Sequence, residues 1–255
     1  MNAYLQPNRI HNGDCLQLMK EIPAKSVDMI LCDLPYGTTQ NKWDSVIPLD
    51  LLWAEYERVI KDNGAIVLFG AQPFTSELVM SNPKLFRYSL VWEKNKSTGF
   101  LNANKMPLRI HEDILVFYKK LPTYNPQKTT GHKPANRYTK HTSDGTNYGK
   151  TKKGIKGGGQ TDRHPTSVLK FPVMNNDNDS KFHPTQKPVP LYEWLIQSYT
   201  NEGETVLDNC SGAGTLAFAC LNQNRNFICI EQNEEYYEES VKRLETVMEK
   251  EGVVN

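Results

Sequence analysis

The chain has 255 residues, of which 38% are hydrophobic, and its formal net charge at pH 7 is +1. A chain of this length can bury one substantial core and carry one appended module, so we expect a domain of catalytic size and exclude a short peptide-like binder. No stretch approaches the roughly 18 uninterrupted apolar residues of a membrane-spanning helix, and the first residues lack a basic region followed by an apolar run; we therefore expect a cytoplasmic protein without a membrane partner.

The chain up to residue 118 alternates short apolar strands with amphipathic helices, a pattern typical of an α/β fold with a largely parallel sheet. The apolar spacing predicts strands at 9–12, 27–32, 65–69, 88–92 and 114–118, and helices at 15–21 and 49–61. After residue 180 it predicts helices at 191–199, 215–222 and 233–250, and strands at 205–207 and 226–230.

Residues 119–180 interrupt this rhythm with Gly, Pro, Thr, Asn and Lys, which predicts a loop-rich insert. Twelve basic and two acidic residues lie between positions 119 and 170, a local net charge of +10 that leaves −9 for the rest of the chain. Such a segment is a candidate surface for nucleic-acid phosphates, and a solvated basic face is the alternative. The candidate DNA-binding residues within it are Lys133, Arg137, Lys152 and Lys153.

The five cysteines show neither a CxxC pair nor a histidine partner at zinc spacing. We interpret them as reduced packing residues and predict no metal site. They are Cys15, Cys32, Cys210, Cys220 and Cys229.

A strand, a glycine turn and a helix follow one another from Val206 onwards, in the sequence VLDNCSGAGTL. Gly212 and Gly214 allow backbone to approach a ligand closely, and Asp208 can accept from a ligand ammonium. The next strand runs into Glu231, whose carboxylate suits the two hydroxyls of a ribose. This pattern favours a nucleoside cofactor over a plain tight turn. A sulfonium cofactor with an amino-acid tail suits Asp208 better than the pyrophosphate of NAD does.

An earlier apolar strand runs directly into Asp33-Leu-Pro-Tyr36. A strand cap with a turn is one interpretation, and activation of an amino group is the other. The exocyclic nitrogen of adenine becomes nucleophilic when two acceptors hold its hydrogens, here the Asp33 carboxylate and the Leu34 carbonyl. Pro35 restricts Leu34 to extended geometry, and Tyr36 offers a ring on which a flipped base can stack.

Asp33-Leu-Pro-Tyr36 resembles the (D/N/S)PP(Y/F) catalytic motif of the DNA amino-methyltransferases, and the segment from Asp208 to Gly214 resembles their DPFxGxG cofactor motif. Because the catalytic motif comes first, with a basic stretch between the two, the chain is similar to the permuted beta group of adenine-N6 and cytosine-N4 methyltransferases.

Two further segments are similar to that family. His183-Pro-Thr-Gln-Lys-Pro188 matches the segment that precedes the cofactor strand and closes over the methionine end of the cofactor. Together with the opening Asn12-Gly-Asp14-Cys, the matches span nearly the whole chain except residues 119–180.

The resemblance implies a Rossmann-like methyltransferase fold with a mostly parallel seven-stranded sheet, helices on both faces and a circularly permuted motif order. It divides the chain into a catalytic half at 1–118, a target-recognition insert at 119–180 and a cofactor-binding half at 181–255.

The resemblance also implies the site residues. Catalysis would fall to Asp33, Leu34, Pro35 and Tyr36. Binding of S-adenosylmethionine would involve Asp14, Cys15, Thr185, Lys187, Asp208, Cys210, Gly212, Gly214 and Glu231. Thr185 and Lys187 are expected at the cofactor carboxylate, with a structural cap as the alternative for Thr185. Lys42 and Trp43 lie in a polar segment expected to close over the flipped base and contact DNA, and a surface turn is the alternative there.

Two positions depart from the family pattern. Leu34 replaces the first proline, which removes one backbone restraint on Asp33 but keeps the carbonyl acceptor. Cys210 replaces the phenylalanine that packs beside the cofactor. Neither change removes a reacting group.

The expected activity is therefore site-specific methylation of adenine N6 in double-stranded DNA by base flipping. Cytosine N4 is the alternative, although its enzymes generally carry Ser at the first catalytic position. Protein-glutamine methyltransferases place the cofactor motif first, and nothing resembles an RNA-binding module. A nonenzymatic nucleic-acid binder on a methyltransferase fold is the alternative from another class. The family resemblance also implies a homodimer, and it allows both a solitary enzyme and one paired with a cognate restriction endonuclease.

Overall fold

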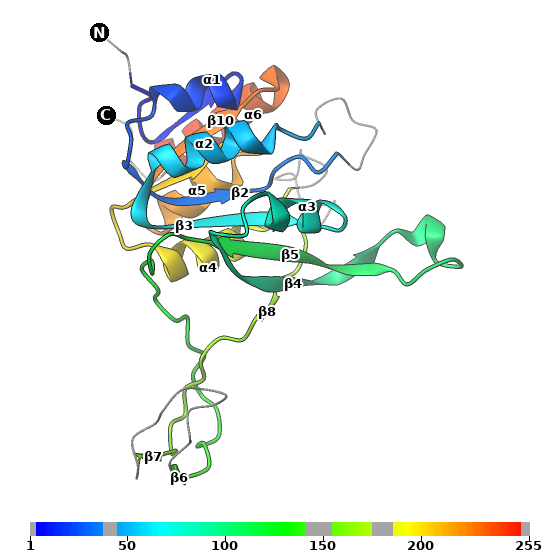
Figure 1. Ribbon diagram of the computed structural model, residues 1–255, viewed down its shortest axis with the longest axis vertical. Coiled ribbons are helices and arrows are strands. Elements are labelled where there is room, and N and C mark those ends of the chain that lie inside the picture. The colour runs from blue at the N-terminus through cyan, green and yellow to red at the C-terminus, as the bar shows by residue number, and fades with distance from the viewer. Residues whose placement is uncertain (1–3, 38–44, 141–154, 175–185, 251–255) are drawn as a thin grey trace. The chain divides into compact units, whose positions relative to one another are not determined.

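The computed structural model describes residues 4–37, 45–140, 155–174 and 186–250. Within these ranges the chain forms two compact units, Met1–Asn125 together with Ser167–Asn255, and Pro126–Thr166. The first unit holds a mixed sheet between two layers of helices (Figure 1). None of the helices in the described ranges combines the length and the apolar composition that crossing a bilayer requires.

An eight-stranded sheet forms the centre of the first unit. Its order is β1 (Arg9–Asn12), β10 (Asn226–Glu231), β9 (Thr205–Asp208), β2 (Val27–Cys32), β3 (Ile60–Gly70), β5 (Arg109–Phe117), β4 (Phe86–Thr98) and β8 (Val168–Lys170). Strand β5 alone runs against its neighbours, and the other pairings from β1 to β3 and between β4 and β8 are parallel. The expected Rossmann-like α/β fold is confirmed, with β8 as a short additional edge strand.

One face of the sheet is covered by α1 (Cys15–Leu18), the 3-10 turn η1 (Met19–Glu21), α2 (Leu49–Val59) and α3 (Phe74–Ser81). Helix α2 presents Leu52, Tyr56 and Val59 at helical spacing, and all three are fully buried. They pack with Ile30 and Cys32, the alternate residues of β2, because successive side chains of a strand point to opposite faces.

The other face is covered by α4 (Val189–Tyr199), α5 (Thr215–Asn222) and α6 (Glu234–Lys250). Met29 and Leu31 of β2 point to this side and pack with Leu195 of α4 and Leu216 of α5. From Met29 to Cys32, β2 is buried on both faces and forms a continuous apolar run, as parallel core strands do.

Most predicted elements lie where the sequence places them, and the differences are local. Helix α3 was not predicted, and β3, β4 and β5 are longer than their apolar runs. The second compact unit, Pro126–Thr166, covers fewer residues than the insert expected at 119–180. On one side of it the backbone N–H of Asn125 donates to the Ser198 carbonyl in α4 at 2.8 Å, and on the other side β8 pairs with β4, so both flanks belong to the first unit.

In the parts of the second unit that the structure describes, 126–140 and 155–166, regular structure is sparse. There the unit has one antiparallel pair, β6 (Tyr138–Lys140) with β7 (Ile155–Gly157), and an isolated bridge between Thr129 and Arg163. Its range of the sequence holds nine basic and two acidic residues. The loop-rich, basic character predicted from the sequence is present in this part of the chain.

Candidate active site

Three carboxylates stand at the ends of neighbouring strands. Asp33 follows the last residue of β2, Asp208 is the last residue of β9, and Glu231 is the last residue of β10. Because these strands are parallel and adjacent, their carboxyl ends meet at one edge of the sheet. Neighbouring strands lie about 4.8 Å apart, so the outer two of the three strand ends are about 10 Å from each other.

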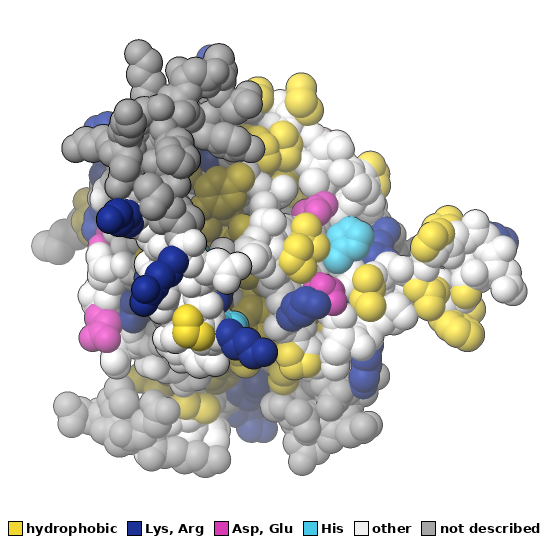
Figure 2. Space-filling view, turned by 90° about the horizontal axis from the view of Figure 1, so that it is seen from below, with side chains coloured by type: hydrophobic (Ala, Val, Ile, Leu, Met, Phe, Trp, Pro, Cys, Tyr) yellow, Lys and Arg dark blue, Asp and Glu magenta, His cyan; other side chains and the backbone are white. Residues whose placement is uncertain are grey.

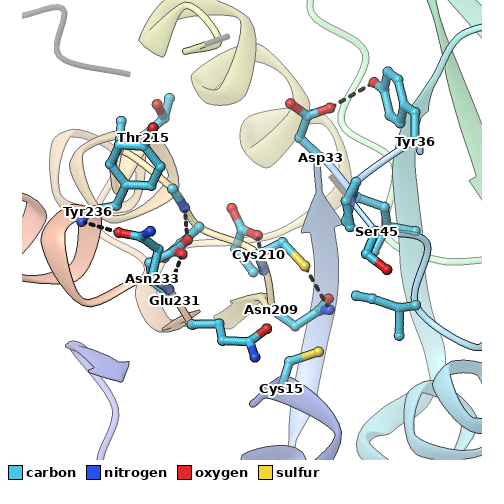
Figure 3. A pocket seen from close by; sticks show the side chains of 18 of the residues that line it. Cys15, Asp33, Tyr36, Ser45, Asn209, Cys210, Thr215, Glu231, Asn233 and Tyr236 are labelled. Carbon is cyan, nitrogen blue, oxygen red and sulfur yellow. Dashed lines mark hydrogen bonds between the residues drawn. The ribbon is translucent and has the colours of Figure 1, made fainter. Parts of the chain in front are cut away.

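One cavity of about 680 Å³ joins the two predicted motifs. Asp33 and Tyr36 lie on one side of it, Glu231 and Tyr236 on the other, and Cys210 between them (Figure 3). The other predicted residues in its lining are Asp14, Cys15, Leu34, Pro35, Lys187, Asp208 and Gly212. A small-molecule cofactor and one nucleobase can therefore meet in a single pocket.

The glycine turn closes one end of the cavity. The backbone N–H of Gly212 donates to Glu231 Oε2 at 2.7 Å and ties the turn to the end of β10. Gly214 begins α5 with a φ of 71°, and a Cβ there would lie 3.3 Å from the side chains of Ile10 and Ser240. Both the backbone conformation and the close packing require glycine at position 214. Gly214 is not in the cavity lining and supports the turn from behind.

The cavity holds more negative charge than its own surroundings neutralise. Burial raises the pKa of Asp208 to about 7, although the backbone N–H of Cys210 donates to its Oδ1 at 3.1 Å. Burial also raises the pKa of Glu231, against backbone N–H donors that include Asn233. A cationic ligand would favour the ionised form of both carboxylates.

Asp33 is held by two donors. The Tyr36 hydroxyl donates to Asp33 Oδ1 at 2.7 Å, and the Lys187 ammonium donates to Asp33 Oδ2. Lys187 also lies 3.3 Å from Glu112 Oε2, and Glu112 in turn accepts from Lys94. Two carboxylates and two ammonium groups therefore alternate in a largely buried, electrically balanced chain behind the catalytic motif.

The pKa values in this chain follow from burial and pairing. Burial raises the pKa of Asp33, and the Lys187 ammonium opposes that rise. Burial would raise the pKa of Glu112, but Lys187 and Lys94 together bring it below its usual value. Burial would lower the pKa of Lys187, but Asp33 and Glu112 raise it, so this lysine stays charged. The sequence placed Lys187 at the cofactor carboxylate; in the structure its ammonium pairs with Asp33.

The catalytic motif is braced from the side. Leu34 is 3% exposed and packs in the cluster under α2, so side-chain burial restrains this backbone where the family motif has a proline. The Tyr36 ring stacks on Phe74 of α3, with centroids 5.2 Å apart and planes 23° from parallel. Phe74 thereby fixes the plane that Tyr36 presents at the cavity.

Two buried polar side chains of the lining have no hydrogen-bond partner among the described residues. They are Gln186, through both amide atoms, and Ser211, through its hydroxyl. Buried polar groups are nearly always bonded to protein, water or ligand. These atoms are therefore available to water or to a polar ligand in the cavity.

The other predicted residues differ in where they lie. Asp14, at the rim of the cavity, is exposed and caps α1 by accepting from the Gln17 N–H at 3.0 Å. Lys133 and Arg137 are exposed in the second unit. The predicted residues outside the described ranges are Lys42, Trp43, Lys152, Lys153 and Thr185.

Glu112, Gln186 and Phe74 were missed by the sequence reasoning. Glu112 stands just before the apolar run of β5. A carboxylate beside an apolar strand marks the site at Asp33, Asp208 and Glu231, so the sequence held a weak signal that Glu112 also belongs to the site. Gln186 lies inside the His183–Pro188 segment that was already matched. Nothing in the sequence pointed to Phe74 as a neighbour of Tyr36, because the helix that carries it, α3, was not predicted.

Comparisons with known proteins identify the family. A family model described as DNA methylase matches residues 27–242. The chain is 29% identical over 249 residues to the type II methyltransferase M.HpaI of Haemophilus parainfluenzae, covering 93% of this chain and 74% of that protein. It is 29% identical over 272 residues to the DNA adenine methyltransferase YhdJ of Escherichia coli K12, covering 96% and 87%.

Solved structures share the fold. The M1.HpyAVI–SAM complex superposes with a TM-score of 0.62 at 24% identity, covering 92% of this chain and 98% of that one. The cytosine-N4-specific PvuII DNA methyltransferase gives a TM-score of 0.69 at 15% identity, covering 95% and 88%. With most of its length matched by the family model, and with both motifs in one cavity, the chain belongs to the DNA methylase family of N6- and N4-amino-methyltransferases.

Proposed function

We propose that this protein is an S-adenosylmethionine-dependent DNA methyltransferase that methylates adenine N6. The observation that carries the proposal is the single cavity that Asp33 and Tyr36 share with Gly212 and Glu231. A carboxylate that activates an amino group and a binding site for a nucleoside cofactor share a cavity when a chemical group is transferred from the cofactor to the amino group.

The residues of the cavity fit the cofactor. Buried Asp208, with its pKa of about 7, suits an ammonium, and Glu231 suits ribose hydroxyls. Gln186 and Ser211 supply polar atoms to which no described residue is hydrogen-bonded. The cofactor brings a methyl group on a positively charged sulfur, a charge that the surrounding carboxylates favour.

Asp33 and the Leu34 carbonyl hold the target amino group. Each carboxylate oxygen has two acceptor sites, so Asp33 can accept an amino hydrogen while it keeps Tyr36 and Lys187. With both hydrogens held, the nitrogen lone pair is withdrawn from the ring and directed at the methyl group. As the new N–C bond forms, the S–C bond breaks to leave a neutral thioether, and the positive charge that passes to the nitrogen would be stabilised by the Asp33 carboxylate until one amino proton is lost through it to solvent.

Lys187 and Tyr36 act on Asp33 as positioning residues. Lys187 favours the ionised form of a carboxylate whose pKa burial raises, and the two donors fix its orientation. Tyr36 also offers a ring to the flipped base, a stacking interaction worth roughly 1 to 3 kcal/mol that offsets part of the cost of extruding a base.

Adenine is favoured over cytosine by Asp33. The cytosine-N4 enzymes of this family generally have Ser at that position, and YhdJ, a relative over nearly the whole chain, is named an adenine methyltransferase. Cytosine N4 is the second candidate, because the PvuII enzyme has the same fold.

The insert and the partners belong to the same proposal. Residues 119–180, with the compact unit Pro126–Thr166 at their centre, would serve as the target-recognition region between the two catalytic halves. The basic character of that unit supports contact with duplex DNA. We also propose a homodimer, from the family resemblance, and a cognate restriction endonuclease, from the type II names of the relatives.

The test is transfer of labelled methyl from the cofactor to DNA from cells without adenine or cytosine-N4 methylation. After digestion to nucleosides, mass spectrometry should find label in N6-methyladenine. Label in N4-methylcytosine would make the second candidate correct. Tight DNA binding without any label would favour the nonenzymatic binder.

A further inference from the structure

The hairpin between β4 and β5 runs out past the body of the sheet and ends in an apolar tip (Figure 1). We call residues 95–110 the arm. Every residue of the arm except Leu108 is exposed. The view in Figure 2 shows hydrophobic side chains gathered on this protrusion. Phe100 is 81% exposed, Leu101 97% and Met106 58%.

The arm is ordered by its own backbone. Gly99 begins η2 (Phe100–Asn102) with a φ of 87°, and Met106 N–H donates to Asn102 O at 3.0 Å. Thr98 pairs with Arg109 across the hairpin. None of the exposed apolar side chains contributes to either core cluster, so folding of the first unit does not explain them.

The base of the arm belongs to the active site. Glu112, which pairs with Lys187 behind Asp33, follows the arm by two residues in β5. Lys94, which pairs with Glu112, precedes the arm in β4. Because β5 runs against β3, its first residues lie at the sheet edge where β2 and β3 end. The arm therefore starts beside the pocket that receives the target base.

The charge of the arm favours DNA as its occupant. It carries Lys96, Lys105 and Arg109 and no Asp or Glu. The extended residues of β4 within the arm, 95–98, reach about 13 Å, the length of about four base-pair steps. Proteins that bend or open a duplex insert apolar side chains between base pairs and hold the flanking phosphates with Lys and Arg.

We propose that the arm binds the duplex beside the flipped base, with Phe100 and Leu101 as a wedge between base pairs and with Lys105 and Arg109 on phosphates. The inference rests on the proposed function, because that function makes DNA the ligand. It adds a contact outside both the pocket and the basic insert.

The experiment measures binding of a 30-base-pair mixed-sequence duplex by fluorescence anisotropy at several salt concentrations. The tip variant carries Phe100→Ser and Leu101→Ser; the cation variant carries Lys105→Gln and Arg109→Gln. Matched controls are Met80→Ser, an apolar residue 71% exposed on α3, and Lys20→Gln on η1. Cofactor binding and sedimentation are measured for every variant.

The tip variant should bind the duplex about tenfold more weakly with an unchanged salt slope. The cation variant should lose about 1.8 from the slope of log affinity against log salt, since each lost phosphate contact removes about 0.9. Both should bind cofactor as the wild type does, and the controls should not change.

Wild-type duplex affinity and salt slope in both arm variants would overturn the inference. So would a tip variant that turns dimers into monomers without loss of DNA affinity, which would make the arm a contact with a second copy. Failure of the proposed function would be recognised separately, because the wild type itself would then transfer no methyl group to DNA, whatever the DNA affinity of the arm variants.

Discussion

At the residue scale, the catalytic carboxylate depends on a lysine 154 positions away in the sequence. No local pattern predicts that pair, because the motif match only placed Lys187 in a segment that closes over the cofactor. The identity of Asp33, Asp208 and Glu231 was predictable, since each ends an apolar strand. Their surroundings were not, because Glu112 and Lys94 reach the site through long-range pairing of β4 with β5.

Lys187→Gln should shift the acid limb of the pH profile of methylation to higher pH. Without the ammonium, the pKa of Asp33 rises further, so as the pH falls the carboxylate becomes protonated at a higher pH than in the wild type. The profile of kcat against pH is the measurement, with Lys94→Gln as a control that leaves Asp33 its partner. An unmoved limb with weakened cofactor binding would return Lys187 to the cofactor carboxylate.

Asp208 should make cofactor binding depend on pH near neutrality. Its pKa of about 7 leaves it about half protonated at pH 7, and a ligand ammonium favours the ionised form. Affinity should therefore rise as pH increases through 7, with release of about half a proton at pH 7. Calorimetry in buffers of different ionisation enthalpy measures this release. Asp208→Asn should abolish it, and undiminished release from that variant would assign the proton to another group.

At the element scale, what could be predicted followed from burial. Strand β2 and helix α5 are largely apolar because both are packed within the core. The bounds predicted for both agree with the structure. Helix α3 is short, with only Phe74, Thr75 and Leu78 buried, too few positions for a helical period. The outer half of β4 is exposed and polar, so it lacks the alternation that marks a strand.

The start of α5 can be tested through its glycine. Gly214→Ala should cost about 1 to 2 kcal/mol of unfolding free energy for its left-handed backbone, and more because its Cβ would press on Ile10 and Ser240. Gly203→Ala is the matched control, with a φ of 78° and no atom within 4 Å of the added Cβ. Chemical denaturation and cofactor titration should show that only Gly214→Ala also weakens cofactor binding. Equal effects of the two changes on both measurements would remove the packing argument.

At the scale of the whole molecule, the two hydrophobic clusters lie entirely within the first compact unit. The basic insert was predictable as a loop-rich segment from its composition, but its limits were not. Lys119 and Lys120 pair with Asp62 at the end of the sheet, so these two cations belong to the catalytic unit.

Replacing residues 126–166 by a short Gly-Ser linker should leave the core intact. Thermal unfolding and cofactor affinity should remain close to the wild type, because no buried residue of either cluster is removed. Methylation of DNA should fall strongly, because the basic unit and its phosphate contacts are gone. Retained methylation at the wild-type site would show that recognition lies elsewhere, for example on the arm.

The most direct measurement of the central claim is a single-turnover comparison of the wild type with Asp33→Asn, with cofactor saturating and DNA from methylation-deficient cells. The amide keeps the shape of the side chain but loses the charge and one acceptor. We predict methyl transfer slower by about a hundredfold or more, with cofactor affinity within about twofold of the wild type. Transfer by Asp33→Asn at the wild-type rate would contradict the account, since the amino group would then be activated without the carboxylate.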